Sequence, residues 1–263
     1  MSRKIADLEF ARRPERTLKL DLYLPEPPGK PAPVLIWIYG GGWLSGSKDP
    51  CHTEYMTASG FAAASIEYRY SQEAIFPAAV EDCHAAVCWL RSHAAEFGLD
   101  GRRIGLFGPS AGGHLTALLG TSGHYRNWSG FDGPPDCGAV QAVVDVSGPT
   151  LLTRYADRSL QQKYPDLSGV ITRFLGGPVE QRLAQARDAS PATYVHPGCP
   201  PFLILHGRQD EIVPIEEAAL LHEALLACGV DSTFLPVTDA GHGIIKPWVP
   251  PLVLDFFQRT LRP

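Results

Sequence analysis

The chain has 263 residues, of which 44% are hydrophobic and 19% are charged, a composition typical of a folded globular protein rather than a disordered or fibrous one. The net charge of −5, with no run of Lys or Arg beyond pairs such as Arg12–Arg13, argues against nucleic acid as a partner. No stretch approaches about 18 consecutive apolar residues, so no membrane-spanning helix is expected. The N-terminal residues lack the apolar core of a secretory signal, which predicts a cytoplasmic protein.

The six cysteines are scattered along the chain without a CxxC pair. We expect them to be reduced and mostly buried, because a chain of this size without a signal usually keeps its thiols free. The CHAAVC segment does not predict a zinc site, since Cys83 and Cys88 would point about 140° apart on a helix. His84 and Cys88 can share a helix face, but two ligands make no site. No metal is therefore expected.

Strand-like segments begin at Thr17–Pro25, where polar and apolar residues alternate and predict a half-buried antiparallel strand near a sheet edge. Six later segments are short, mostly apolar runs of the kind found in buried strands. These are 33–39, 61–68, 103–108, 139–148, 201–207 and 232–237. Helical patterns lie between several of them, notably at 78–98 and at 215–229, where Gly229 is placed to end a helix. The alternation predicts a single α/β domain over residues 1–263, with a mostly parallel central sheet flanked by helices.

Residues 149–189 interrupt this alternation with mixed polarity and several arginines and tyrosines. We interpret them as a cap-like insertion that lies over the sheet, rather than as a second domain. Together with the loop at 69–77, this insertion is expected to shape a binding pocket. Ligands of such sheets bind beyond the carboxyl ends of the strands, so residues that directly follow strands are the candidates for chemistry.

The segment GPSAGG at 108–113 contains the only G-x-S-x-G pattern of the chain. It follows a predicted strand and precedes a helical pattern, which places Ser110 on a tight strand-to-helix turn. Gly108 and Gly112 are needed in such a turn because side chains there would collide. The helix N-terminus would also stabilise negative charge beside the serine. One helical turn later, His114 is expected to pack or to form hydrogen bonds. The simpler alternative is a glycine-rich turn with an incidental serine.

A serine hydroxyl becomes a nucleophile when a base accepts its proton, and that base needs an acid to fix its tautomer. In doubly wound hydrolases the order along the chain is nucleophile, acid and base, with the acid and base on loops after later strands. Asp210 follows the strand at 201–207, and His242 follows the strand at 232–237. We therefore assign Asp210 as the acid and His242 as the base.

Four other side chains compete for these roles. Asp239 lies in the loop of His242 and is the second candidate for the acid. Glu211 is adjacent to Asp210 and should point elsewhere. His206 closes an apolar strand and is expected to be a core histidine, and Asp145 ends a buried strand, where it could support the site through a hydrogen bond.

Three consecutive glycines follow the buried strand at 33–39, within the segment WIYGGGWLSGS. Each glycine costs up to about 1 kcal/mol of conformational entropy relative to alanine, so a functional reason is expected. Acyl transfer passes through an oxyanion, which backbone N–H donors stabilise by about 3–4 kcal/mol each. We assign the N–H groups of Gly41, Gly42 and Ala111 to an oxyanion hole. Trp43 is either a wall of the pocket or part of the core.

Five segments, in this order, resemble the α/β-hydrolase superfamily, and within it the lipase/esterase branch of hormone-sensitive lipase and the bacterial feruloyl-esterase-like (BD-FAE) carbohydrate esterases. They are 36–49, 76–91, 103–123, 189–214 and 239–243. The resemblance implies the α/β-hydrolase fold and the same roles for Ser110, Asp210, His242 and the glycine loop. Tyr39 stands where that family usually has a histidine. Its hydroxyl either anchors the loop or reaches into the pocket, so Tyr39 and Trp43 are the expected substrate-binding residues.

These features predict a cofactor-free serine carboxylesterase that acts through an acyl-enzyme. Its expected substrates are short-chain esters, or aromatic-acyl or acetyl esters of sugars. An amidase of the kynurenine formamidase type, with the same triad, is the alternative. A non-catalytic ligand-binding relative is a third interpretation, which the presence of all three triad residues disfavours. The expected partner is a small-molecule ester, with no nucleic acid and no membrane, and the chain is expected to be a monomer or a small homo-oligomer.

Overall fold

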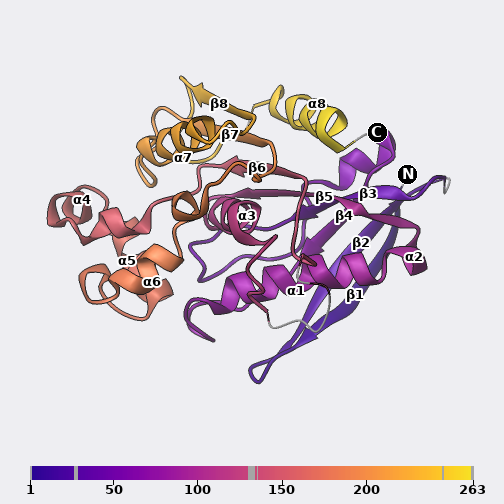
Figure 1. Ribbon diagram of the computed structural model, residues 1–263, viewed down its shortest axis with the longest axis horizontal. Helices are drawn as coiled ribbons and strands as arrows, with labels where there is room; N and C mark the ends of the chain where they lie inside the picture. The colour runs from indigo at the N-terminus through magenta and orange to yellow at the C-terminus, as the bar shows by residue number, and fades with distance from the viewer. Residues whose placement is uncertain (1, 27–28, 130–133, 135, 245, 262–263) are drawn as a thin grey trace.

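Eight strands form one sheet in the order β1-β2-β4-β3-β5-β6-β7-β8 (Figure 1). The computed structural model describes residues 2–26, 29–129, 134, 136–244 and 246–261. The strands are β1 Ser2–Arg12, β2 Thr17–Pro25, β3 Ala32–Trp37, β4 Ala62–Ile66, β5 Leu99–Pro109, β6 Ala142–Val146, β7 Phe202–Gly207 and β8 Ser232–Val237. β1 and β4 pair with β2 in antiparallel fashion, whereas the strands from β4 through β8 pair in parallel. The predicted mostly parallel α/β sheet is confirmed.

The edge of the sheet differs from the prediction. β2 has the predicted bounds and is antiparallel, but β1 lies outside it and forms the edge. β1 exposes most of its charged residues, and Phe10 is its one buried side chain. Charged side chains on an edge strand discourage pairing with other chains. The same charges kept this segment from resembling a strand in the sequence.

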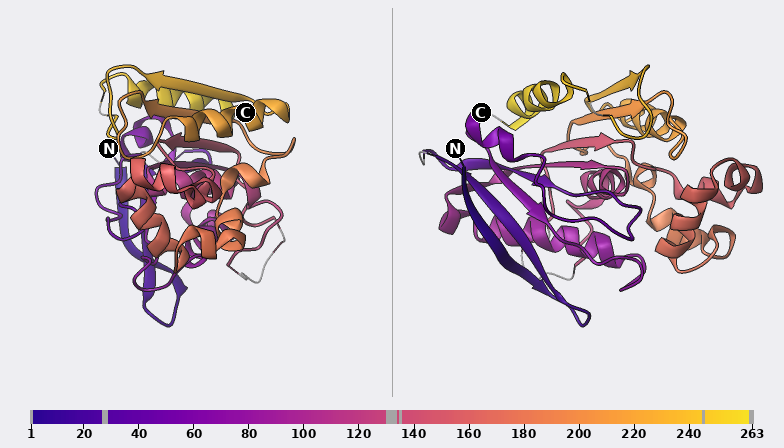
Figure 2. Two further views of the ribbon diagram at one scale, coloured as in Figure 1. Left: turned by 90° about the vertical axis from the view of Figure 1, so that its left-hand side faces the viewer. Right: turned by 180° about the vertical axis from the view of Figure 1, so that it is seen from behind.

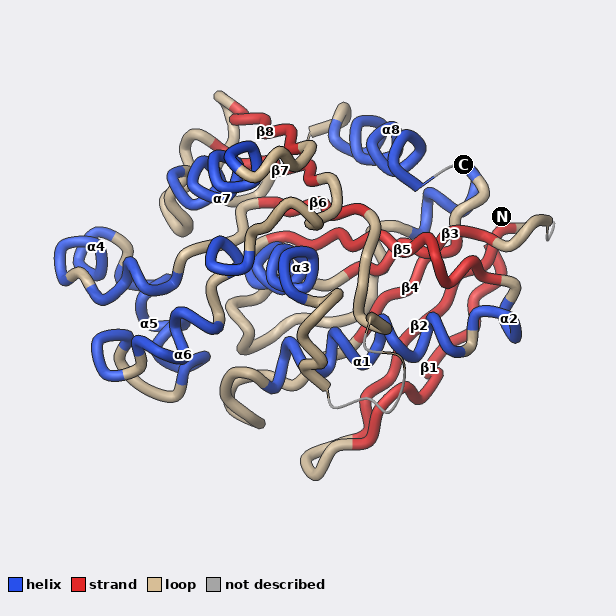
Figure 3. The backbone as a smooth tube through the Cα atoms, in the orientation of Figure 1, coloured by secondary structure: helices blue, strands red, loops and turns tan. Residues whose placement is uncertain are grey.

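Helices cover both faces of the sheet (Figure 3). They include α1 Ala78–Ser92, α2 Ala94–Phe97, α3 Ala111–Ser122, α7 Glu216–Ala227 and α8 Val249–Leu261. On one face, α3 brings Gly120 against Val143 and Phe202. On the other face, Phe257 of α8 packs against Gly105. Gly105 pairs with Ala142, the residue before Val143, and successive residues of a strand face opposite sides of the sheet. No helix within the described ranges is long and apolar enough to cross a membrane.

Residues 149–189 form short helices at the end of the molecule that lies farthest from the two termini (Figure 2). The α-helices among them are α4 Arg158–Lys163, α5 Pro165–Leu175 and α6 Leu183–Asp188. α5 is amphipathic and buries Leu167, Ile171, Phe174 and Leu175. One face of this insertion therefore packs against the rest of the molecule.

The expectation of six reduced cysteines is wrong for two of them. Cys88 in α1 and Cys137 before β6 form a disulfide, with Cα atoms 4.8 Å apart. The two cysteines are 49 positions apart, and residue spacing does not reveal that they meet. His84 lies beside it, with Nδ1 3.6 Å from the Cys88 sulfur. The sequence argument counted two potential metal ligands here and missed the third, Cys137, but sulfurs joined in a disulfide offer no thiolates to a metal.

Candidate active site

Ser110 occupies the turn between β5 and α3 with φ 55° and ψ −122°, a backbone conformation that few residues other than glycine adopt. Its N–H donates to the carbonyl of Val146 at 2.7 Å, and its carbonyl accepts the N–H of His114 at 2.9 Å. A Cβ on Gly108 would lie 2.5 Å from the backbone of Gly112, and a Cβ on Gly112 would collide with the carbonyl of Ile38. The predicted tight turn, and the need for glycine on both sides of it, are confirmed.

The structure brings Ser110, His242 and Asp210 into one hydrogen-bonded line. Nε2 of His242 lies 2.9 Å from the hydroxyl of Ser110, which is 132 positions away in the chain. Nδ1 of His242 lies 2.9 Å from Oδ2 of Asp210. A carboxylate accepts hydrogen bonds, so Nδ1 carries the proton and Nε2 is left to accept the serine hydroxyl. This is the tautomer that a serine nucleophile requires.

Asp210 is held ionised. Its Oδ1 accepts the backbone N–H groups of Ile212 and Val213, each at 2.9 Å. Burial acts to raise the pKa of Asp210, but hydrogen bonds to its carboxylate, first from His206 and then from His242, outweigh burial and hold the pKa below its usual value. The carboxylate therefore keeps its negative charge beside His242.

A cavity of about 480 Å³ opens over the serine and the histidine. Its lining residues come from the glycine loop, the Ser110 turn, the insertion and the loops after β7 and β8. They are Gly41, Gly42, Trp43, Pro109, Ser110, Ala111, Pro149, Asp166, Leu167, Val170, Ile212, Val213, His242 and Gly243. Most of these side chains are apolar, and Asp166 is the one carboxylate among them. Since α5 supplies three of the lining residues, the insertion contributes directly to the cavity.

The glycine loop places backbone N–H groups at this cavity. Gly41 and Gly42 have φ values of +119° and +62°, and a Cβ on Gly41 would collide with the carbonyl of Ser45. Within the described residues, the N–H groups of Gly41, Gly42 and Ala111 donate to no protein acceptor. All three residues line the cavity, so these N–H groups are the candidates to bind a ligand there.

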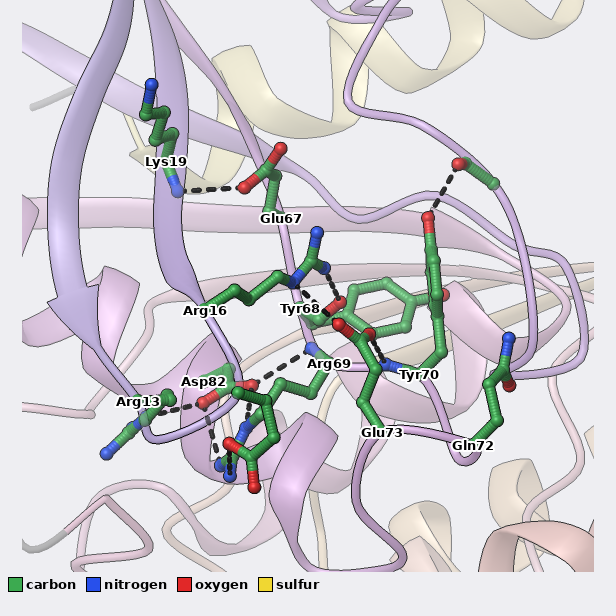
Figure 4. A network of polar contacts seen from close by, with 12 residues as sticks. Arg13, Arg16, Lys19, Glu67, Tyr68, Arg69, Tyr70, Gln72, Glu73 and Asp82 are labelled. Atoms are coloured by element: carbon green, nitrogen blue, oxygen red, sulfur yellow. Dashed lines mark hydrogen bonds and ion pairs between the residues drawn. The ribbon is translucent and has the colours of Figure 1, made fainter.

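Four carbonyls of the glycine loop are held by the segment 68–73, which follows β4. The Tyr68 hydroxyl donates to the carbonyl of Tyr39 at 3.0 Å, and the N–H of Ser71 donates to the carbonyl of Trp43 at 2.8 Å. The side-chain amide of Gln72 donates to the carbonyl of Leu44 at 2.6 Å, and the Tyr70 hydroxyl donates to the carbonyl of Gly46 at 2.7 Å. Figure 4 shows Tyr68, Tyr70 and Gln72 on this segment. Because these four carbonyls are bound on this side, the loop is held in place without using the N–H groups of Gly41 and Gly42.

A network of ion pairs fixes the segment 68–73 in turn (Figure 4). Asp82 of α1 is fully buried and accepts Nε of Arg69 at 2.8 Å, Nη2 of Arg69 at 3.0 Å and Nε of Arg13 at 2.8 Å. Glu73 accepts the N–H of Tyr70 at 2.7 Å and pairs with Arg16 at 3.1 Å. The bidentate pair of Arg69 and Asp82 has a rigid geometry, so the segment 68–73 is well suited to position the glycine loop.

Tyr39 does not occupy the expected substrate-binding position. Its ring stacks on Tyr68 with centroids 4.5 Å apart and packs against Gly46, and the residue is 5% exposed. Its hydroxyl lies 3.5 Å from that of Tyr70. Among the described residues that line the cavity, Trp43 is present and Tyr39 is not. Of the two roles considered for Tyr39, the structure gives it the one of anchoring the loop.

Trp43 combines the two roles that the sequence left open. It lines the cavity, yet it is 1% exposed and stacks on Phe174 of α5 at 4.4 Å. Its indole N–H donates to Nδ1 of His114 at 3.3 Å, and Nε2 of His114 lies 2.7 Å from the carbonyl of Ala189. Burial lowers the pKa of His114 to about 4, which keeps the ring neutral. His114 therefore has the predicted hydrogen-bonding role and joins Trp43 to the end of the insertion.

None of the four competing side chains is a member of the hydrogen-bonded line of Ser110, His242 and Asp210. Asp239 pairs with Lys246 at 2.6 Å on the surface, and Glu211 is exposed. Asp145 is buried and accepts the N–H of Gly148 at 2.9 Å. His206 is fully buried, as expected of a core histidine, but its Nε2 lies 3.2 Å from Asp210, a contact the sequence analysis missed. The signal in the sequence was that His206 and Asp210 are four residues apart on either side of the end of β7, which places them close enough to touch.

Comparison with known proteins places the chain in a family. The family model BD-FAE matches residues 20–225. The protein belongs to the BD-FAE family. It is 32% identical to Esterase LipC of Mycobacterium tuberculosis over 222 residues, which are 82% of the chain and 54% of LipC. It is 26% identical to Carboxylesterase NlhH of the same species, over 81% of the chain and 67% of NlhH. The chain thus spans about half the length of LipC and two thirds of NlhH.

Solved structures support the same assignment for this BD-FAE protein. A truncated carbohydrate esterase from gut microbiota superposes with a TM-score of 0.85 at 26% identity, covering 98% of the chain and 96% of that structure. The esterase Est2 of Thermogutta terrifontis superposes with a TM-score of 0.79 at 25% identity, covering 96% of the chain and 90% of Est2. The predicted α/β-hydrolase fold is confirmed by these neighbours and by the sheet topology.

Proposed function

We propose that this BD-FAE protein is a serine carboxylesterase in which Ser110 is the nucleophile, His242 the general base and Asp210 the acid that orients it. The observation that carries the proposal is the hydrogen-bonded line from Ser110 through His242 to Asp210, at 2.9 Å and 2.9 Å, which meets a cavity edged by free N–H groups. Matches to proteins named esterase and carboxylesterase support the same reaction class. The mechanism requires no metal or cofactor.

The proposed reaction begins when Nε2 of His242 takes the proton of the Ser110 hydroxyl as its oxygen attacks the ester carbonyl. The carbonyl electrons form an oxyanion, which the N–H groups of Gly41, Gly42 and Ala111 receive. The carbon–oxygen bond to the alcohol then breaks, and the alcohol leaves with the proton from His242. Water, deprotonated by His242, attacks the acyl-enzyme in the same way and releases the acid and free Ser110.

Apolar side chains and the size of the cavity favour esters with a short or aromatic acyl group. Acetyl and aromatic esters of sugars belong to this proposal because one structural neighbour is described as a carbohydrate esterase. The amidase and the non-catalytic binding protein gain no support from the site, and the relatives named above are esterases.

Hydrolysis of p-nitrophenyl acetate, butyrate and octanoate by wild type, Ser110→Ala and Ser92→Ala tests the proposal. Ser92 lies exposed near the end of α1 and serves as the matched control. We expect Ser110→Ala to lower kcat by about a thousandfold or more with unchanged circular dichroism, and Ser92→Ala to match wild type. A Ser110→Ala protein that keeps the wild-type rate would end the proposal. Acetylated sugars in the same panel test the narrower substrate class.

A further inference from the structure

A second histidine touches the carboxylate of Asp210. His206, the next to last residue of β7, is fully buried. Its Nε2 lies 3.2 Å from Oδ2 of Asp210 and 2.9 Å from the carbonyl of Val213. Oδ2 is the same oxygen that receives Nδ1 of His242 at 2.9 Å. One carboxylate oxygen therefore lies between two imidazoles.

The proton positions on His206 follow from its neighbours. Both atoms close to its Nε2 are oxygens, a carbonyl and an ionised carboxylate, and both can only accept hydrogen bonds. Nε2 must therefore carry a proton, shared between the two oxygens. Val213 completes a closed set of contacts, because its N–H donates to Oδ1 of Asp210 at 2.9 Å while its carbonyl accepts from His206. The donor and the carboxylate are thus fixed relative to each other by a short stretch of backbone.

The sheet face that carries His206 also carries a buried carboxylic acid, Asp145. Nδ1 of His206, Oδ2 of Asp145 and Oγ of Ser147 are buried atoms for which the described residues provide no hydrogen-bond partner. The register pairs Asp145 with Ile204, so Asp145 and His206 project from the same face of β6 and β7. Burial raises the pKa of Asp145 to about 7, while a charge on His206 acts to lower it and Glu217 of α7 acts to raise it.

We propose that His206 is a positioning residue for the esterase reaction, holding the carboxylate of Asp210 in the orientation that His242 requires. This inference rests on the proposed function, since it assigns His206 an effect on that reaction. His206 is not among the described residues that line the cavity, and its polar contacts are with Asp210 and with the carbonyl of Val213, so it reaches the reacting groups through Asp210.

The loss of this donor has two expected consequences. First, the carboxylate gains freedom to turn away from His242, which lowers kcat and leaves KM nearly unchanged. Second, the charge of Asp210, no longer shared with His206, holds the proton of the His242 imidazolium more tightly. Because the neutral ring is the active form, the acid limb of the pH profile of kcat/KM moves to higher pH.

The test compares His206→Gln with His206→Met. The two side chains are similar in size, but only the amide of glutamine can donate from the position of Nε2. We expect His206→Met to lower kcat by about tenfold to a hundredfold, the range for a hydrogen bond to a charged group, and to move the acid limb up by about half a unit or more. His206→Gln should recover most of the rate and the wild-type limb. Equal rates and equal limbs in the two variants would overturn the proposal.

Two further measurements keep the outcomes separate. Titration of the active serine with a fluorophosphonate, performed first on wild type, reports the proposed function without involving His206. A failure there concerns the esterase itself, whereas normal titration with identical Gln and Met variants concerns the role of His206 only. If His206→Met does not fold, nitrogen NMR of the histidines in wild type decides the question. We expect a protonated Nε2 on His206 throughout the active pH range, and an unprotonated Nε2 would refute the inference.

Discussion

The hydroxyl of Tyr70 donates to the carbonyl of Gly46 at 2.7 Å and so ties the segment after β4 to the glycine loop. If this contact helps to aim the loop's amides, Tyr70→Phe should lower kcat by about three- to tenfold with little change in KM, because oxyanion stabilisation acts mainly in the transition state. Tyr55→Phe, which removes a hydroxyl bonded to Pro250 on the surface, is the matched control. Identical kinetics for both variants would show that the loop does not depend on Tyr70.

Asp166 is the one carboxylate among the described residues that line the cavity, and it predicts a preference for uncharged over anionic esters. Asp166 is exposed at the start of α5, and no cationic side chain is among the described residues that line the cavity. Asp166→Asn should therefore raise kcat/KM for an ester with an anionic acyl chain, such as mono-p-nitrophenyl glutarate, by about three- to tenfold. The rate on p-nitrophenyl butyrate should stay unchanged. Glu223→Gln on α7 removes an exposed charge away from the cavity, and an equal effect of that variant would contradict a local role of Asp166.

Buried neutral histidine makes the fold sensitive to acid. Burial lowers the pKa of His114 to about 4 from 6.5, so between these values the unfolded chain binds a proton that the folded chain does not. Stability is therefore lost as pH falls through this window. Wild type should lose about 2–3 kcal/mol more than His114→Gln in free energy of unfolding between pH 7.5 and pH 4.5.

Urea unfolding of the two proteins at both pH values measures this difference. Asp145, whose pKa burial raises to about 7, acts with the opposite sign, since its stabilising effect is lost as pH rises. It is present in both proteins and cancels in the comparison. Parallel losses of stability in wild type and His114→Gln would contradict the account of His114.

The disulfide predicts a measurable dependence on reductant. Cys88 and Cys137 are 49 positions apart, and closing a loop of that size stabilises the fold by about 4 kcal/mol in the chain-entropy account, with 2–4 kcal/mol the usual range. The double variant Cys88→Ser, Cys137→Ser should be less stable by about this amount and insensitive to reductant. Cys228→Ser, at a free thiol, is the control. Titration of denatured wild type should find four free thiols, and six would contradict the pairing.

The sequence predicted the sheet and the meeting of Ser110, His242 and Asp210, because both depend on local patterns. Apolar runs located β3 through β8, and glycines at 108 and 112 located the turn of Ser110, where the backbone tolerates no larger side chain. Positions directly after β7 and β8 gave Asp210 and His242, since the carboxyl ends of parallel strands meet at one edge.

What the sequence could not show depends on contacts between distant segments. The charged residues of β1 gave no strand pattern, because its pairing with β2 is an edge contact. Tyr39 was expected at the substrate, but its stacking on Tyr68 required knowledge of the neighbouring loop. The pairing of Cys88 with Cys137 and the contact of His206 with Asp210 likewise arise from how loops cross the ends of the elements.

The most direct test of the central claim is the covalent labelling of wild type by diethyl p-nitrophenyl phosphate, read by intact mass and peptide mapping. A hydroxyl activated by His242 should displace p-nitrophenolate and carry one diethylphosphoryl group per chain. We predict that this group is found on Ser110 and that Ser110→Ala carries no adduct. His242→Gln should react much more slowly than wild type. An unmodified wild type, or a modification that maps to another residue, would contradict the account.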